Sequence, residues 1–338
     1  MHMANELLSV SVAAGTCGAA AVGLGLVCRR AKKILPTDNL ALMGILGAFV
    51  FAAQMVQFPL PFMPGVSGHL TGAVLLAIIL GPCAGAITIS SVIIIQCLIF
   101  QDGGLLALGC NIINMGLVPS FAGYYLYKLI INTNPSQLRI YVGTIIACVI
   151  SLGIGAVLVP VEAVLSGILK VPFITFLKTM VGVHLVIGII EGLITAALLV
   201  YLKQVRPEII ADCAPSPARL SRNAVCITLI IAAFIVAGGL SLFASELPDG
   251  LEWSYSERPN QPEFESVIPN QSPVIASVDN FHARYSPLPD YTIPSNPTST
   301  GWTSFIAVAG AAFTMATIWL TAALIRKRNG NQNAPCTS

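Results

Sequence analysis

The sequence predicts an all-α, polytopic membrane protein with about nine transmembrane helices. Of its 338 residues, 55% are hydrophobic and only 9% are charged, and the mean hydropathy is +0.82. Soluble domains usually carry about 25% charged residues, so this composition argues against a soluble enzyme, a disordered chain and a nucleic-acid-binding protein. The net charge of +2 is too small to indicate a polyanionic partner. The expected environment is the lipid bilayer.

Nine apolar stretches are candidates for membrane-spanning helices, each of which needs roughly 20 apolar residues. They are residues 7–28, 40–58, 69–82, 84–100, 105–130, 139–160, 179–202, 223–244 and 302–325. The third and fourth are short and are separated by Gly81-Pro82. Proline removes a backbone donor, so such a break needs neighbouring protein or a cavity to satisfy the backbone. These two stretches are either short tilted helices or one broken unit.

The basic residues of the loops predict the orientation of the chain. Thirteen of the 17 fall in one set of loops, which the positive-inside rule places in the cytoplasm. They are Arg29, Arg30, Lys32, Lys33, Lys128, Arg139, Lys203, Arg206, Arg219, Arg222, Arg326, Lys327 and Arg328. With nine spans, the N-terminus is predicted outside the cell (inner) membrane and the C-terminus in the cytoplasm.

The chain divides into a core and a smaller companion module. We expect a seven-helix core over 1–206, a cytoplasmic linker over 207–222 and a two-helix module over 223–338. Residues 245–301 of this module are predicted to be external. They contain eight acidic and two basic residues, and they are rich in Pro, Ser and Asn. This composition predicts a loose extracytoplasmic loop.

Two of the four histidines lie on the predicted outer side and suggest a metal site. His2 follows the chain's first residue, and His69 begins the third apolar stretch. The amine of Met1, the amide nitrogen of His2 and the His2 imidazole can chelate one metal in adjoining rings, and His69 can add a fourth nitrogen. An all-nitrogen tetragonal set suits Ni²⁺ or Cu²⁺, and imidazole also suits other late divalent metals. The alternative is that His2 is an ordinary exposed terminal residue.

Several polar residues interrupt the apolar stretches and could support such a site. They are Gln54, Gln96, Asn111, Asn114, His184 and Glu191. Buried amides need partners, so ordinary hydrogen bonds between helices explain most of them. The functional alternative is that they orient the histidine rings. His184 and Glu191 share one helical face, where they form either a structural pair or part of a site.

A second motif suggests a different function. Gly65-Val66-Ser67-Gly68 matches the G-x-S-G pattern of rhomboid intramembrane serine proteases, with His184 as the candidate base. Serine–histidine pairs are recognised by geometry and not by spacing, and four positions with one free are weakly specific. The structural alternative is a Gly/Ser turn that opens a helix, with Ser67 as its N-cap.

Long ordered blocks of the first 205 residues resemble a known family. They are Met1-His2, "LMGILGAFVFAAQM" (42–55), "SGHLTGAVLLAIILGPCAG" (67–85), "QDGGLLALGCNIINMG" (101–116) and "HLVIGIIEGLITA" (184–196). These blocks closely resemble the CbiM/NikM-type metal-binding permease (S) component of energy-coupling factor (ECF) cobalt and nickel transporters. "PDGLEW" (248–253) and the two helices beside it resemble the small PDGLE/NikN-like companion module of these systems, fused here to the core.

The resemblance implies a seven-helix subunit that imports Ni²⁺ or Co²⁺ from outside. It also implies that Met1, His2 and His69 hold the metal through four nitrogens. The chain opens "MHMANELLS", where the family more commonly has a sequence like "MHIPDGFLS", so the chelating pair is unchanged but the following turn differs. The chain contains no Walker-type G-x-x-x-x-G-K-[ST] sequence. We therefore expect a transport subunit without its own ATPase, whose partners are ECF ATPase subunits and a coupling transmembrane (T) component.

Overall fold

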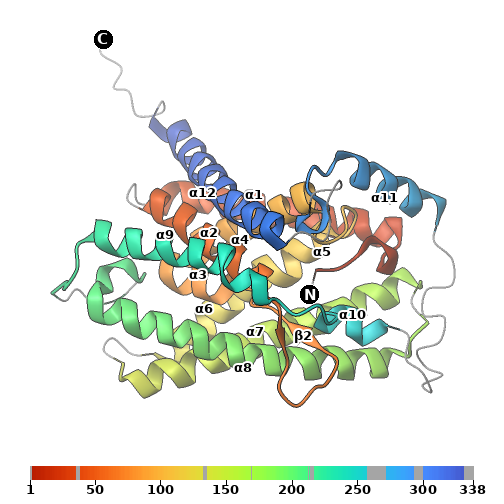
Figure 1. Cartoon of the computed structure of the whole chain (residues 1–338), viewed down its shortest axis with the longest axis horizontal. Helices are drawn as coiled ribbons and strands as arrows, with labels where there is room; N and C mark the ends of the chain where they lie inside the picture. Colours follow the sequence, from red (N-terminus) through yellow and green to blue (C-terminus); the bar gives the residue numbers. More distant parts are fainter. Residues whose placement is uncertain are drawn as a thin grey trace, which may run out of the picture.

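Helices make up nearly all of the regular structure. A computed structural model of the chain describes residues 2–35, 39–131, 135–168, 170–211, 213, 217–256, 272–292 and 300–330 (Figure 1). The α-helices are α1 (Val10–Ile34), α2 (Asn39–Met55), α3 (Ala73–Leu80), α4 (Pro82–Phe100), α5 (Leu108–Asn111), α6 (Val118–Ile130), α7 (Gln137–Ser166), α8 (Phe173–Val205), α9 (Arg222–Gly238), α10 (Gly250–Tyr255), α11 (Pro273–Tyr285) and α12 (Thr300–Gly330). The short turns are η1 (Asn5–Leu7), the π-helical η2 (Ile112–Leu117), η3 (Pro207–Ile209), η4 (Leu240–Phe243) and η6 (Pro289–Tyr291). The all-α prediction is confirmed.

Six of the described helices are long and apolar enough to cross a membrane. They are α1, α4, α7, α8, the run of α9 with η4, and α12. Helix α2 is apolar but shorter. The predicted span 105–130 contains the run α5–η2–α6, and the predicted span 69–82 contains only the eight-residue α3. The chain is thus a multi-pass membrane protein, and the count of nine spans stays a prediction.

The predicted break at Gly81-Pro82 is a tight turn between two separate helices. Gly81 has a φ of +85°, in the range that favours glycine, and Pro82 occupies the first turn of α4, where its missing N–H costs little. A Cβ added to Gly85 would lie only 2.6 Å from Cα of Ala77, so α4 folds back closely on α3. All eight residues of α3 are buried. The two stretches are therefore a helical hairpin inside the bundle, not one broken unit.

Burial separates central from peripheral helices. In the most apolar stretch of each helix, 78% of the residues are buried in α4, but only 17% in α1 and 28% in α12. The outer faces carry large apolar side chains such as Val22 and Leu26, which are 65% and 59% exposed. An apolar outer face suits contact with lipid.

The last helix of the companion module packs directly on the core. A Cβ added to Gly44 of α2 would lie 2.7 Å from the carbonyl oxygen of Met315, and one added to Gly47 would meet the side chain of Ile318. Small residues let helix backbones approach closely in membrane proteins. Helices α2 and α12 therefore form one packed unit across the two parts of the chain.

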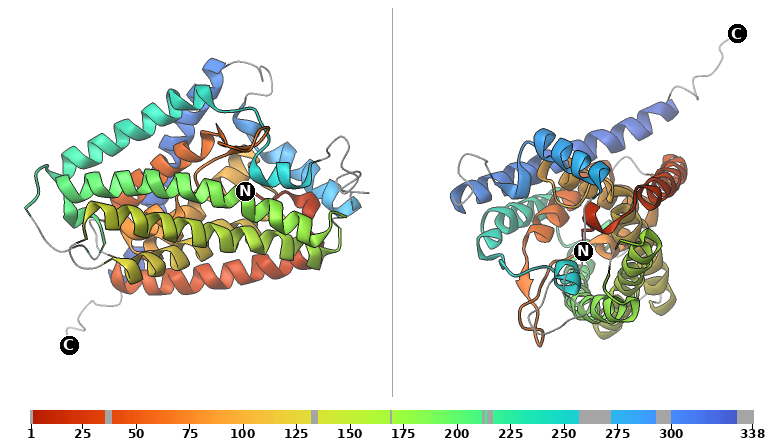
Figure 2. Two further views of the ribbon diagram at one scale, coloured as in Figure 1. Left: turned by 90° about the horizontal axis from the view of Figure 1, so that it is seen from below. Right: turned by 90° about the vertical axis from the view of Figure 1, so that its right-hand side faces the viewer.

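One end of the bundle is covered by segments from both parts of the chain. Figures 1 and 2 show α10, α11 and the N-terminal segment gathered there.

The expectation of a loose loop over 245–301 is wrong for its described parts, since 250–255 and 273–285 are helical. Residues 257–271 and 293–299 lie outside the described residues. At the opposite end of α8, Nζ of Lys203 donates to the carbonyl of Pro135.

Candidate metal-binding site

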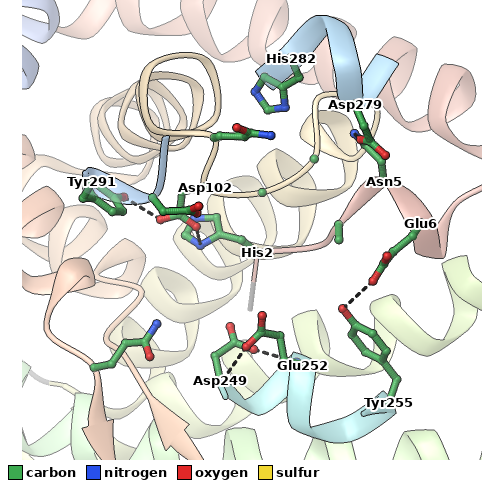
Figure 3. Close-up of a pocket in the computed structure, with 16 residues that line it drawn as sticks. His2, Asn5, Glu6, Asp102, Asp249, Glu252, Tyr255, Asp279, His282 and Tyr291 are labelled. Carbon is green, nitrogen blue, oxygen red and sulfur yellow. Dashed lines mark hydrogen bonds and ion pairs between the residues drawn. The ribbon is translucent and has the colours of Figure 1, made fainter. Parts of the chain in front are cut away.

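A cavity of about 490 Å³ opens at the covered end of the bundle (Figure 3). It is lined by the N-terminal segment, the loop after α4, and parts of α10, α11 and η6. The acidic lining residues are Glu6, Asp102, Asp249, Glu252, Asp279 and Asp290. The lining also includes His2 and His282, and it has no lysine or arginine among the described residues. A cavity of this charge attracts cations.

The backbone next to His2 is fixed by one buried amide. Asn111 accepts a hydrogen bond from the backbone N–H of Met3 (2.7 Å) and donates one to the carbonyl of Met3 (3.2 Å). That carbonyl also accepts from the N–H of Gly104 (2.9 Å). Met3 is fully buried. Asn111 thus holds in place the residue that follows His2, while Met1 lies outside the described residues.

His2 forms a chain of polar contacts with two residues of the cavity wall. Its Nδ1 lies 3.0 Å from Oδ1 of Asp102, and the hydroxyl of Tyr291 donates to Oδ2 of Asp102 (2.7 Å). Burial alone would raise the pKa of Asp102, but His2 and the Tyr291 hydroxyl outweigh it and hold the pKa well below its usual range. Nε2 of His2 is buried and has no hydrogen-bond partner among the described residues. Asp102 is therefore a carboxylate that orients the imidazole.

His69 reaches the same place from a different part of the chain. It follows β2 (Ser67–Gly68), which pairs antiparallel with β1 (Phe58–Pro59). Its ring stacks on the ring of His2, with centroids 5.5 Å apart and planes inclined by 13°. Nδ1 of His69 lies 3.1 Å from the carbonyl oxygen of Leu70, and a proton on Nδ1 in this contact leaves the lone pair on Nε2. The fold thus brings together the two predicted imidazole ligands.

Two of the predicted supporting residues hold the turn after His69. The carboxylate of Glu191 accepts from the N–H of Thr71 (2.7 Å), the hydroxyl of Thr71 (2.9 Å) and the N–H of Gly72 (3.0 Å). Gln54 donates to the carbonyl of Thr71 (2.7 Å). Gly72 has a φ of +74°, and a Cβ there would lie 2.6 Å from Val50. Glu191 therefore binds a backbone turn, and the contacts described for it are with this turn and not with His184, the alternative of a structural pair.

Two of the other predicted supporting residues, Asn114 and His184, bond groups other than the two histidines. Asn114 donates to Oε2 of Glu162 (2.8 Å). Nδ1 of His184 bonds the carbonyl of Met180 in its own helix (2.8 Å). Gln96 is fully buried in α4.

The contacts of Ser67 do not form the dyad of a serine protease. Its hydroxyl donates to the carbonyl of Leu247 (2.7 Å), and its N–H donates to the carbonyl of Pro248 (2.9 Å). Within the part of the chain that the structure describes, Nε2 of His184 has no hydrogen-bond partner. Ser67 lies in β2, so the expected helix N-cap is also wrong. Its bonds instead attach the companion module to the core.

Sequence reasoning missed Asp102 and Asp249 as residues beside the histidines. Oδ2 of Asp249 lies 3.9 Å from Nε2 of His69. Both aspartates stand in sequence blocks that carry the family resemblance, "QDGGLLALGCNIINMG" and "PDGLEW". Their place in these blocks was the sequence signal that could have identified them as candidate site residues. Among the described residues, no group of three or more His, Cys, Asp and Glu side chains is arranged to hold a metal. The predicted donor set, which includes backbone nitrogens as well as side chains, stays a prediction.

Two family models match the chain. The model described as "Cobalt uptake substrate-specific transmembrane region" (CbiM) matches residues 2–209. The model described as "PDGLE domain" matches residues 223–327. Together they cover the core and most of the companion module.

Relatives of this chain have transport names, and two of the three named here are described as fused proteins. The "Putative fused nickel transport protein NikMN" of Archaeoglobus fulgidus is 32% identical over 296 residues, covering 87% of this chain and 89% of the relative. The "Probable fused nickel transport protein LarMN" of Lactiplantibacillus plantarum is 29% identical, with 78% and 80% covered. The "Cobalt transport protein CbiM" of Geobacter sulfurreducens is 27% identical, with 70% and 72% covered.

A solved structure shares the fold of the core. It is described as a truncated transition metal transporter, and it is 29% identical with a TM-score of 0.52. The match covers 60% of this chain and 98% of that one. With the matched family models, these similarities show that the chain belongs to the CbiM family of cobalt uptake substrate-specific transmembrane proteins and carries a fused PDGLE domain.

Proposed function

We propose that this chain is the substrate-binding membrane subunit of an ECF-type importer for Ni²⁺ or Co²⁺. The metal is captured at the outer face by four nitrogens: the amine of Met1, the amide nitrogen and imidazole of His2, and the imidazole of His69. The chain depends on separate ATPase subunits and a coupling T component, to which it presents the loaded metal. Its N-terminus lies outside and its C-terminus in the cytoplasm.

The observation that supports this proposal most is the stacking of His2 on His69. Their ring centroids lie 5.5 Å apart although the residues come from distant segments. Both rings are at least nine-tenths buried, beside a cavity lined by six carboxylates. Imidazoles suit Ni²⁺ and Co²⁺, and selectivity among late divalent metals follows from geometry more than from raw affinity.

The contact between His2 and Asp102 changes when the metal binds. A chelate ring that joins the amide nitrogen and the imidazole of His2 closes through Nδ1. In the free protein, Nδ1 lies 3.0 Å from Oδ1 of Asp102. Metal loading therefore exchanges this contact for a metal–nitrogen bond, and the deprotonation of the His2 amide releases a proton.

Calorimetry on the purified full chain in detergent tests the metal site. We expect His2→Ala and His69→Ala each to lower the affinity for Ni²⁺ and Co²⁺ at least a hundredfold, because each removes one ligand. His282→Gln is the matched control: His282 lines the same cavity, but its Nε2 bonds the carbonyl of Cys97 (2.7 Å). The metal affinity of His282→Gln should match that of the wild type.

An alanine inserted after Met1 is a sharper probe of the chelate. It moves the imidazole from the second to the third position, which adds an amide to the chelate and leaves every side chain of the bundle unchanged. We expect a new visible absorption spectrum of bound Ni²⁺. Unchanged affinity in His2→Ala and His69→Ala, together with an unchanged spectrum after the insertion, would refute the proposal.

A further inference from the structure

The turn at Pro248–Tyr255 of the fused PDGLE domain contacts both segments that carry the histidines. On one side, the hydroxyl and N–H of Ser67 donate to the carbonyls of Leu247 and Pro248. On the other side, the hydroxyl of Tyr255 donates to Oε1 of Glu6 (3.1 Å). Burial raises the pKa of Tyr255, and the Glu6 carboxylate raises it further, so the hydroxyl keeps its proton and donates.

Apolar contacts hold the same turn in place. Leu251 is 1% exposed and packs in a cluster with Met3, Leu7 and Leu8 of the N-terminal segment. A Cβ added to Gly250 would collide with the side chain of Val183, so the turn lies directly against α8. It thus forms one wall of the cavity beside the histidines, and Figure 3 shows Asp249 and Glu252 on this wall.

Asp249 is the residue of this wall that faces a metal-binding atom. Its Oδ1 accepts from the N–H groups of Leu251 and Glu252, each at 2.8 Å, and its own N–H donates to Oε2 of Glu252 (3.2 Å). This capping box fixes the rotamer and leaves Oδ2 at 3.9 Å from Nε2 of His69. The Asp249 side chain is 13% exposed and that of His69 is 5% exposed.

The charge of the loaded site supplies a reason for a carboxylate here. In the donor set of the proposed function, on which this step rests, one nitrogen is a deprotonated amide and three are neutral. A divalent metal in this set leaves a net charge of about +1 in a buried place, and a buried charge needs a compensating partner. Asp102 lies beside His2, and Asp249 is the carboxylate that lies beside His69.

We propose that Asp249 is a positioning residue that provides the countercharge for the metal bound at His69, and that the turn at Pro248–Tyr255 holds Asp249 in this place. The fused domain is then a part of the metal site. The loss of such a supporting group typically costs 10–100-fold in metal affinity.

Two substitutions of Asp249 separate its charge from its role in the turn. Asp249→Asn keeps a good N-cap and removes the charge, whereas Asp249→Glu keeps the charge and weakens the cap, because Asn caps helices as well as Asp does and Glu is not a preferred cap. We expect Asp249→Asn to bind Ni²⁺ 10–100-fold more weakly with an unchanged melting temperature. Asp249→Glu should bind more tightly than Asp249→Asn. Glu246→Gln removes an equal charge from an exposed position three residues away and should bind like the wild type.

The absorption spectrum of bound Ni²⁺ completes the test. If Asp249 supplies charge without ligating, Asp249→Asn and the wild type share one spectrum. A changed spectrum would overturn the proposal by making Asp249 a ligand, and so would wild-type affinity in Asp249→Asn or weaker binding in Asp249→Glu than in Asp249→Asn. His69→Ala is measured in parallel: if its affinity is unchanged, the proposed function itself fails, whereas loss in His69→Ala with no effect of Asp249→Asn removes only this inference.

Discussion

Two buried side chains fix the backbone beside the histidines, one for each. Asn111 bonds both the N–H and the carbonyl of Met3. Glu191 accepts from two backbone N–H groups and a hydroxyl in the Thr71–Gly72 turn. Buried polar groups that satisfy each other in this way order a site, because breaking one bond leaves its partner without a substitute. These residues act on the histidines through the backbone.

Glu191→Ala should destabilise the chain and weaken metal binding. It leaves buried donors on Thr71 and Gly72 without acceptors, and each orphaned donor costs about 1–3 kcal/mol. We expect a clearly lower melting temperature in detergent and a lower Ni²⁺ affinity, with smaller losses in Glu191→Gln because its amide oxygen still accepts. Glu208→Ala is the control, since the Glu208 side chain is 51% exposed. Wild-type melting and binding in Glu191→Ala would contradict this role.

Metal affinity should rise with pH. The amide of His2 must lose its proton to ligate the metal. Binding therefore releases protons, and each released proton makes the affinity about tenfold higher per pH unit. Ni²⁺ titrations between pH 6 and 8, in two buffers with different ionisation enthalpies, measure the number released. An affinity independent of pH would exclude amide ligation.

At the scale of elements, the α3–α4 hairpin depends on the absence of side chains where the two helices meet. Gly85 lies against the backbone of Ala77 and Leu76. The hairpin follows the Thr71–Gly72 turn, so its position also determines where His69 lies. Gly85 allows a close approach of two helices. Gly18 of α1, in contrast, has no described residue within 4 Å of the place where a Cβ would be.

Gly85→Ala should destabilise the protein, and Gly18→Ala should not. Inserting a methyl group where the backbone is 2.6 Å away forces the helices apart, and overpacking of this kind costs about 1–3 kcal/mol. Gly18→Ala adds a methyl group in open space, where the higher helix propensity of alanine gives up to about 1 kcal/mol. Thermal unfolding of both variants in one detergent compares them directly. Equal melting temperatures would show that α3 and α4 are not packed this closely.

At the scale of the whole molecule, local sequence signals predicted the class and not the assembly. Hydropathy is a property of each stretch, so the helical membrane class followed from composition, and Gly81-Pro82 marked a real helix boundary. The contact of Ser67 with Leu247 joins residues 180 positions apart, and no local pattern predicts such a contact. The same holds for Asp249 beside His69. The acidic segment was predicted to be loose because its composition is polar, but Leu251 and Ile275 are buried in it.

The charge distribution of the molecule should make metal capture depend on salt. The cavity is lined by six carboxylates and, among the described residues, by no lysine or arginine. Such a field raises the rate of cation arrival, and its range falls from about 30 Å at 0.01 M salt to about 8 Å at 0.15 M. We therefore expect the association rate of Ni²⁺, measured by stopped flow on the full chain, to fall several-fold over this range.

A double variant tests whether the cavity is the source of this field. Glu252→Gln keeps the capping box, which accepts Gln as well as Glu, and Asp290→Asn suits the φ of +51° at that position. We expect Glu252→Gln/Asp290→Asn to slow association at 0.01 M salt and to flatten its salt dependence, with the dissociation rate unchanged. Glu208→Gln/Glu246→Gln removes the same charge from positions that do not line the cavity and should leave both rates alone. Equal rates in the two double variants would show that the net charge of the protein, and not its cavity, attracts the metal.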